Sequence, residues 1–244
     1  MLRSYLDGVL FADAFGDAPP VVGLHGWGRT RQDLTPIVEP FGGASIDLPG
    51  HGASPEPPEA WGAEQYAEVI AKALEQLHVA PVVLGHSMGG RVAVCLAAAR
   101  PDLVGGLVLT GAPLLRNQTA GGKAPLSFRL AKRLHGLGVV SDARMEAARR
   151  RHGSADYRNA QGVMRDTLVR VVNEDYREQL GRIRCHVEMV WGADDTAATA
   201  TMAGAAASLL GEAAHLEVLP GVGHDTPRHA PDALREAVGR ALAA

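Results

Sequence analysis

Short apolar runs alternate along the chain with longer segments in which apolar residues recur every three or four positions. The runs have the length and the Val and Leu content of strands that are buried on both faces. They lie at 21–24, 44–48, 82–84, 106–109, 187–191 and 216–219, and the segments with helical spacing lie at 65–77, 88–99, 199–210 and 231–243. Strands that alternate with helices predict the α/β class, with a mostly parallel twisted sheet and helices on both of its faces.

Two stretches depart from this alternation. Residues 2–11 alternate around Asp7-Gly8, which predicts a hairpin with a two-residue turn. Residues 113–180 contain no recognisable strand but have helical spacing at 142–151 and 155–172, and they carry 13 Arg and Lys against 7 Asp and Glu. We therefore expect a core domain formed by 1–112 and 181–244, with a basic, all-helical insertion at 113–180.

Composition excludes several classes of protein. The net charge of −3 over 244 residues gives no reason to expect nucleic acid as a partner. No run of 18 apolar residues or signal segment is present, so we expect no membrane span and a cytoplasmic location. The two cysteines, Cys95 and Cys185, are too few for a disulfide framework and are expected to be buried thiols. The histidines follow no metal-ligand spacing, so the sequence predicts no metal site and no cofactor.

The segment Gly85-His86-Ser87-Met88-Gly89-Gly90 stands directly between a predicted strand and a predicted helix. A serine on such a sharp turn has unusual backbone angles, and small residues two positions before and after it let the flanking backbones approach. The turn raises the hydroxyl of Ser87 above the sheet, beside a helix N-terminus that favours a developing anion. This context predicts a nucleophilic serine.

A serine hydroxyl is a weak nucleophile near neutral pH and needs a base, which in turn needs an orienting anion. Candidates follow the last two predicted strands, where Gly192-Ala193-Asp194-Asp195 and Gly221-Val222-Gly223-His224 lie. These segments offer His224 as a candidate base and either Asp194 or Asp195 as the acid. His25 and His51 lie in glycine-rich turns and are expected to bond backbone groups.

With these segments, Leu24-His25-Gly26-Trp27-Gly28 and Asp47-Leu48-Pro49-Gly50-His51-Gly52 make the chain resemble the α/β-hydrolase superfamily along nearly its whole length. The resemblance implies the α/β-hydrolase fold, with 113–180 as its helical lid. From the family's order of serine, acid and histidine, it implies that His224 is the base, and it favours Asp195, the residue three after Gly192, as the acid. It also implies an oxyanion hole formed by the backbone amides of Met88 and Trp27, in which the Trp27 indole lines the acyl pocket.

The expected activity is hydrolysis of a carboxylic ester by a serine esterase, because that reaction requires only the triad and the oxyanion hole. Apolar lid residues that could contact the substrate are Phe128, Tyr157 and Met164. Residues at helical spacing more often belong to an ordinary core. The partner is a small-molecule ester, or an acyl group on an acidic carrier protein that docks on the basic lid through Arg149–Arg151. The second possibility follows from a resemblance to pimeloyl-carrier-protein methyl ester esterases.

Other activities share this scaffold. Haloalkane dehalogenases and epoxide hydrolases place an aspartate at the position of Ser87, so the serine argues against both. Cofactor-free perhydrolases and carbon–carbon hydrolases keep the serine triad, and the sequence does not separate them from esterases. A ligand receptor on the same scaffold is an alternative from a different class, for which no partner motif is visible.

Overall fold

A single mixed sheet forms the centre of the molecule. The computed structural model describes residues 1–78, 80–116, 141, 144–145 and 155–244, and in these residues eight strands are arranged in the order β1-β2-β4-β3-β5-β6-β7-β8. The strands are β1 (Leu2–Tyr5), β2 (Leu10–Ala14), β3 (Val21–Leu24), β4 (Ala44–Asp47), β5 (Val82–His86), β6 (Gly106–Thr110), β7 (His186–Gly192) and β8 (Ala214–Leu219).

The strands from β3 to β8 run parallel to their neighbours, and only β2 pairs with β1 and β4 in the antiparallel sense. All six strands predicted from the apolar runs are present, with ends that differ by at most two residues from the prediction. The carboxyl ends of parallel strands meet at one edge of the sheet. The loops that follow β3, β5, β7 and β8 therefore gather at that edge.

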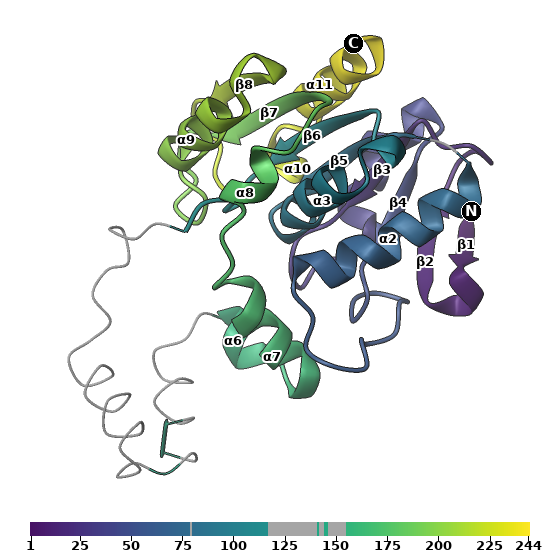
Figure 1. Cartoon of the computed structure of the whole chain (residues 1–244), viewed down its shortest axis with the longest axis vertical. Coiled ribbons are helices and arrows are strands. Elements are labelled where there is room, and N and C mark those ends of the chain that lie inside the picture. Colours follow the sequence, from purple (N-terminus) through teal and green to yellow (C-terminus); the bar gives the residue numbers. More distant parts are fainter. Residues whose placement is uncertain (79, 117–140, 142–143, 146–154) are drawn as a thin grey trace.

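Helices cover both faces of the sheet. On one face α2 and α3 lie side by side (Figure 1), together with α8 and α9, while α1 and α11 cover the other. These helices are α1 (Thr35–Val38), α2 (Ala63–Leu77), α3 (Met88–Ala99), α8 (Arg177–Leu180), α9 (Ala200–Leu210) and α11 (Pro231–Ala243), and the short α10 (Thr226–His229) precedes α11.

The apolar core is divided into two clusters by the sheet. On β5, Val83 packs with the α3 residues Val92 and Leu96 on one face. Its neighbours Val82 and Leu84 pack toward α11 on the other face. Each fully buried side chain of this kind contributes about 1.5–3 kcal/mol relative to exposure. Burial on both faces is the reason why these strands appear in the sequence as unbroken apolar runs.

The N-terminal hairpin is present, but its turn is longer than predicted. Tyr5 pairs with Leu10, so four residues rather than two connect β1 to β2. They include the 3₁₀ turn η1 (Leu6–Gly8), in which Leu6 and Asp7 both have positive φ angles, of 53° and 55°. The longer loop allows Leu6 to pack against the apolar core, and this burial outweighs the local preference of Asp7-Gly8 for a two-residue turn.

Between β6 and β7, the described residues form α6 (Ala155–Asn159), α7 (Gly162–Val171) and α8. The single helix predicted at 155–172 is therefore wrong: it is broken at Ala160-Gln161, where Gly162 begins α7 with a left-handed φ of 49°. Most of the helix predicted at 142–151 lies outside the described residues, in which only Arg144 and Met145 are helical.

Two smaller expectations can be compared with the structure. Cys95 is buried, as predicted, whereas Cys185 is only half-buried, and neither is in a disulfide. None of the helices in the described ranges is long and apolar enough to cross a membrane.

Candidate active site

Ser87 occupies the sharp turn between β5 and α3. Its backbone has φ 52° and ψ −111°, a combination that is strained for any residue with a side chain. Glycines make the turn possible, because a Cβ atom on Gly89 would lie 1.9 Å from the carbonyl oxygen of Leu24, and one on Gly85 would lie 2.6 Å from Cα of Gly90. The amide of Ser87 donates to the carbonyl oxygen of Thr110 at 2.9 Å, which fixes the turn against β6.

His224 lies in the loop after β8 and contacts both other candidates. Its Nε2 is 3.1 Å from Oγ of Ser87, and its Nδ1 is 2.8 Å from Oδ2 of Asp195. A carboxylate can only accept, so Nδ1 carries the proton and Nε2 is free to accept from the hydroxyl. The ring packs against Gly111, where a Cβ atom would lie 3.3 Å from it.

Asp195 is the aspartate that reaches His224. Its side chain is buried, and Oδ1 accepts from the amides of Ala197 and Ala198, at 2.8 Å each. Burial acts to raise the pKa of Asp195, but the hydrogen bonds from His224 and these two amides outweigh it and lower the pKa. The other candidate, Asp194, is exposed. The carboxylate of Asp195 therefore stays ionised beside the imidazole.

The loop after β3 is held next to Ser87 by buried hydrogen bonds. Nδ1 of His25 donates to the carbonyl oxygen of Gly26 at 2.7 Å, and its Nε2 accepts from the amide of Leu48 at 3.0 Å. Burial lowers the pKa of His25 to about 3, so the ring is neutral. His51 bonds the carbonyl oxygen of Pro49. The prediction that His25 and His51 bond backbone groups is confirmed.

The same loop packs against the serine turn, so that Trp27 of this loop and Met88 at the start of α3 are the two candidate amide donors. Gly26 approaches so closely that a Cβ atom there would lie 3.3 Å from Cβ of Ser87. Among the described residues, neither the amide of Trp27 nor that of Met88 donates to an acceptor. The two donors that the sequence singles out are therefore free to bind an anion that forms on a group attached to Ser87.

A cavity of about 580 Å³ lies beside this loop, between it and α6–α7. Trp27 and Met164, two of the residues expected to contact substrate, line the cavity with polar neighbours that include Arg29, Glu56 and Asn159. Tyr157 is not among the lining residues, and its ring packs against the guanidinium of Arg165, 5.4 Å from the ring centroid. Phe128 lies outside the described residues.

The basic residues of the insertion can be compared only in part, because Arg149–Arg151 lie outside the described residues. Arg165 donates through Nε to the carbonyl oxygen of Ala160 at 2.8 Å. Arg170 on α7 donates to the carbonyl oxygen of Ala60 at 2.9 Å. Both side chains thus contribute to holding α6 and α7. In the described part of the chain, no group of three His, Cys, Asp or Glu side chains is placed to hold a metal ion.

Sequence reasoning missed several groups that fix the site. His86 donates through Nε2 to the main-chain oxygen of His224 at 3.0 Å. Asp47 is fully buried and accepts from Arg31 and from the amide of Ala53, which fixes the turn after β4. The sequence showed a charged residue, Asp47, at the end of an apolar run. It did not show the partner, because no spacing pattern relates Arg31 to Asp47.

Comparison with known proteins identifies the class. A profile of the alpha/beta hydrolase family matches residues 21–237, and the chain belongs to this family. It is 31% identical over 209 residues to a pimeloyl-[acyl-carrier protein] methyl ester esterase of Chromobacterium violaceum, a match that covers 76% of this chain and 80% of that protein. A shorter match, 39% identical over 103 residues, is to the esterase Rv0045c of Mycobacterium tuberculosis and covers 38% of this chain and 33% of that protein.

Solved structures show the same fold. The esterase EaEST of Exiguobacterium antarcticum has a TM-score of 0.73 and 20% sequence identity, with 100% of this chain and 99% of that chain covered. The α/β-hydrolase fold predicted from the sequence is confirmed.

Proposed function

We propose that the protein hydrolyses a carboxylic ester through an acyl-enzyme intermediate. The observation that carries this proposal is the continuous chain of contacts from Oγ of Ser87 to Nε2 of His224, and from Nδ1 of His224 to Oδ2 of Asp195. In this proposal Ser87 is the nucleophile, His224 is the general base and then the general acid, and Asp195 holds the imidazole in the required tautomer.

The reaction proceeds in two halves. As Oγ of Ser87 attacks the acyl carbon, its proton passes to Nε2 of His224, which returns it to the departing alkoxide when the ester bond breaks. Water then repeats the sequence on the acyl-enzyme: it gives a proton to His224, attacks the same carbon, and releases the carboxylic acid and the free serine. Water is the only co-reactant, and no oxidant is needed.

Each tetrahedral intermediate has a negative oxygen that needs preorganised donors. The amides of Trp27 and Met88 are proposed for this role, because Trp27 follows Gly26, which packs against Ser87, Met88 follows Ser87 directly, and neither amide donates to a described acceptor. Removing one donor of this kind raises the barrier by about 3–4 kcal/mol. In the proposed division of the chain, 113–180 is a lid, and Met164 and Trp27 contact the substrate in the cavity between lid and core.

The proposal is tested by steady-state hydrolysis of p-nitrophenyl butyrate. Ser87→Ala is expected to lower kcat by at least about a thousandfold, since the triad acts as a unit. Asp195→Asn is expected to lower kcat by about 10³–10⁴-fold, because an asparagine no longer fixes the tautomer of His224. Circular dichroism checks that each variant is folded.

The matched control is Asp194→Asn, one position away on the exposed side of the same loop, which is expected to leave kcat within about twofold. A wild type that releases nitrophenol no faster than Ser87→Ala contradicts the esterase proposal. A single slow turnover per molecule favours a ligand receptor. A greater loss from Asp194→Asn than from Asp195→Asn contradicts the choice of acid.

A second candidate is an ester whose acyl group is carried by an acidic carrier protein. What favours it is the match to the carrier-protein methyl ester esterase over 76% of this chain, together with the 13 basic residues in 113–180. If Arg149–Arg151 dock the carrier, their replacement by Glu lowers kcat/KM for the carrier-linked ester in a salt-dependent way. Turnover of p-nitrophenyl butyrate by the same variant is the control.

A further inference from the structure

One ion pair joins the two loops that carry the proposed catalytic groups. Arg29 lies two residues after Trp27, and Asp225 follows His224 directly. The guanidinium of Arg29 donates through Nη2 to Oδ2 of Asp225 at 2.5 Å. These two residues are 196 positions apart in the sequence, so the contact links distant parts of the chain.

The pair is partly shielded from water. The side chains of Arg29 and Asp225 are 30% and 21% exposed, and the second carboxylate oxygen of Asp225 is buried without a hydrogen-bond partner. A further cation, Arg228, approaches the carboxylate only to 3.8 Å and is 59% exposed. Arg29 is therefore the principal partner of Asp225.

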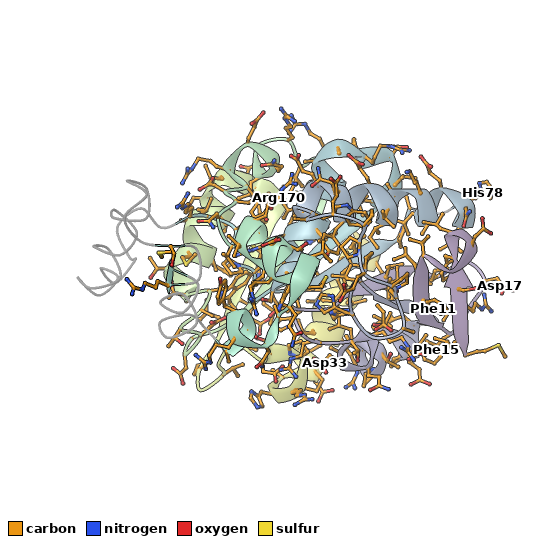
Figure 2. The ribbon with its side chains drawn as sticks, turned by 90° about the horizontal axis from the view of Figure 1, so that it is seen from below. Phe11, Phe15, Asp17, Asp33, His78 and Arg170 are labelled. Atoms are coloured by element: carbon orange, nitrogen blue, oxygen red, sulfur yellow. The ribbon has the colours of Figure 1, made fainter. Side chains whose placement is uncertain are left out.

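Arg29 is held on its other side as well. Its Nη1 is 3.3 Å from Oδ2 of Asp33, and its amide donates to the carbonyl oxygen of Gly26 at 3.3 Å. Asp33 belongs to the 3₁₀ turn η2 (Arg31–Asp33) that precedes α1 and is labelled in Figure 2. A guanidinium held by two carboxylates has little rotational freedom. Arg29 thus connects the loop that carries Trp27 to the segment that contains Asp225.

Asp225 is likewise part of a fixed structure. Its carbonyl oxygen accepts from the amides of Arg228 and His229, so Asp225 begins the helix α10. On the other side of His224, the ring of His86 bonds the main-chain oxygen of residue 224. Burial lowers the pKa of His86 to about 4, so this ring is neutral and adds no charge beside His224. The backbone of His224 is therefore held by His86 and by the Arg29–Asp225 pair.

We infer that Arg29 and Asp225 are positioning residues, which fix the Trp27 amide and the His224 imidazole at the separation needed to act on one acyl group at Ser87. This inference rests on the proposed function. Exposed ion pairs generally contribute little to stability, so the importance of this one lies in geometry. A misplacement of about 1 Å between reacting groups costs about a hundredfold in rate.

The test is a double-mutant cycle measured as kcat and KM for p-nitrophenyl butyrate. Asp225→Asn and Arg29→Met each remove the charge-assisted bond with little change of shape, and each is expected to lower kcat about tenfold with KM within about twofold. The double variant is expected to be no slower than either single variant, because all three lack the same bond. Arg29→Lys, which keeps a cation, is expected to restore part of the lost kcat.

The matched control is Arg228→Met, which removes the exposed cation near the same carboxylate and is expected to keep kcat within about twofold. Three results overturn the inference: kcat within twofold of wild type in both single variants, losses that multiply in the double variant, or a rise in KM without a fall in kcat. Should one variant fail to fold, the comparison of Arg29→Met with Arg29→Lys decides the question. A wild type whose turnover does not depend on Ser87 contradicts the proposed function instead.

Discussion

The backbone of Ser87 stores strain that the glycines around it make possible. A side chain at φ 52° and ψ −111° costs on the order of 1–3 kcal/mol, and the surrounding turn must hold it there. The sequence indicated this strain through the spacing of Gly85 and Gly89 around the serine. The structure adds the cause, which is the close approach of Leu24 to Gly89 and of Gly90 to Gly85.

This strain gives a stability prediction that is separate from activity. Ser87→Gly and Ser87→Ala both lack the hydroxyl and are expected to be inactive. In contrast to the usual order in ordinary helices and strands, the glycine variant is expected to be more stable by about 1–2 kcal/mol, because only glycine adopts these angles without cost. Urea unfolding of the two variants measures the difference, and an alanine variant of equal or greater stability means that the turn is not strained.

Residues with a local signal were found from the sequence, and those without one were missed. The resemblance to the α/β-hydrolase superfamily, which favours the residue three after Gly192, separated Asp195 from Asp194, and the structure brings Asp195 to His224. Arg29 and Asp225 have no such signal, because a contact between residues 196 positions apart leaves no spacing pattern. A sequence alone does not distinguish two charged loop residues that form an ion pair from two that do not.

At the scale of elements, the buried strands were predicted most accurately. Burial on both faces produces unbroken apolar runs, and four of the six predicted strands extend beyond their runs by one or two residues at an end, as at His86 and Thr110. The predictions failed at two places where the apolar pattern does not determine the backbone conformation. Leu6 packs on the core and lengthens the first hairpin. Gly162 begins α7 with a left-handed angle and separates it from α6, although a glycine inside a helical pattern is often tolerated.

Away from the candidate site, one buried carboxylate connects two strands of the sheet with a helix. Glu188 on β7 accepts from His186 at 2.7 Å, from His215 on β8 at 2.9 Å, and from Arg240 on α11 at 2.9 Å. Its side chain is 3% exposed. Burial acts to raise the pKa of Glu188, but the hydrogen bonds from Arg240, His215 and His186 outweigh it and lower the pKa to about 2.

A depressed carboxyl pKa stabilises the folded state at high pH and ceases to do so in acid. The contribution of Glu188 is complete above its ordinary pKa of 4.5 and is lost as the pH falls from there toward about 2. Glu188→Gln is therefore expected to destabilise the protein by about 2–3 kcal/mol near neutral pH, with a smaller difference from wild type at each step below pH 4.5. Urea unfolding of both proteins across this range measures the difference.

The matched control is Glu217→Gln on β8, which removes a more exposed carboxylate 3.4 Å from the same Arg240. It is expected to cost less than about 1 kcal/mol. A Glu188→Gln variant whose deficit is constant with pH shows that shape, and not ionisation, accounts for the effect.

At the scale of the whole molecule, the site follows from the topology of the sheet. Ser87, Asp195 and His224 come from separate parts of the chain and meet because the strands before them are parallel and end at one edge. The sequence was sufficient to predict that these three residues meet, because each follows a predicted parallel strand and the carboxyl ends of parallel strands lie at one edge of the sheet. The sequence did not show which contacts hold the described residues between β6 and β7 against the core. Two of these contacts are made by a buried charged side chain of α3.

That charge is Arg91, four residues after Ser87 and 8% exposed. It donates to the carbonyl oxygen of Pro113 at 3.2 Å, and to that of Val171 at the end of α7 at 2.7 Å. Its guanidinium also lies 5.9 Å from the ring centroid of Tyr176. One side chain of α3 thus binds the residues that follow β6 and also the end of α7; Arg170 of α7 is labelled in Figure 2.

We expect Arg91→Met to destabilise the protein by about 2–4 kcal/mol, because it removes the hydrogen bond to the half-buried carbonyl group of Pro113 and the buried one to Val171, whose carbonyl oxygen keeps only the amide of Glu174 at 3.3 Å. Hydrogen exchange is expected to increase more in peptides that cover 162–176 than in those that cover α2, since the loss is concentrated where α7 meets α3. Arg170→Met is the control: its side chain is 48% exposed and should cost less than about 1 kcal/mol. Equal increases of exchange in 162–176 and in α2 would mean that Arg91 stabilises the core as a whole and does not specifically hold this segment.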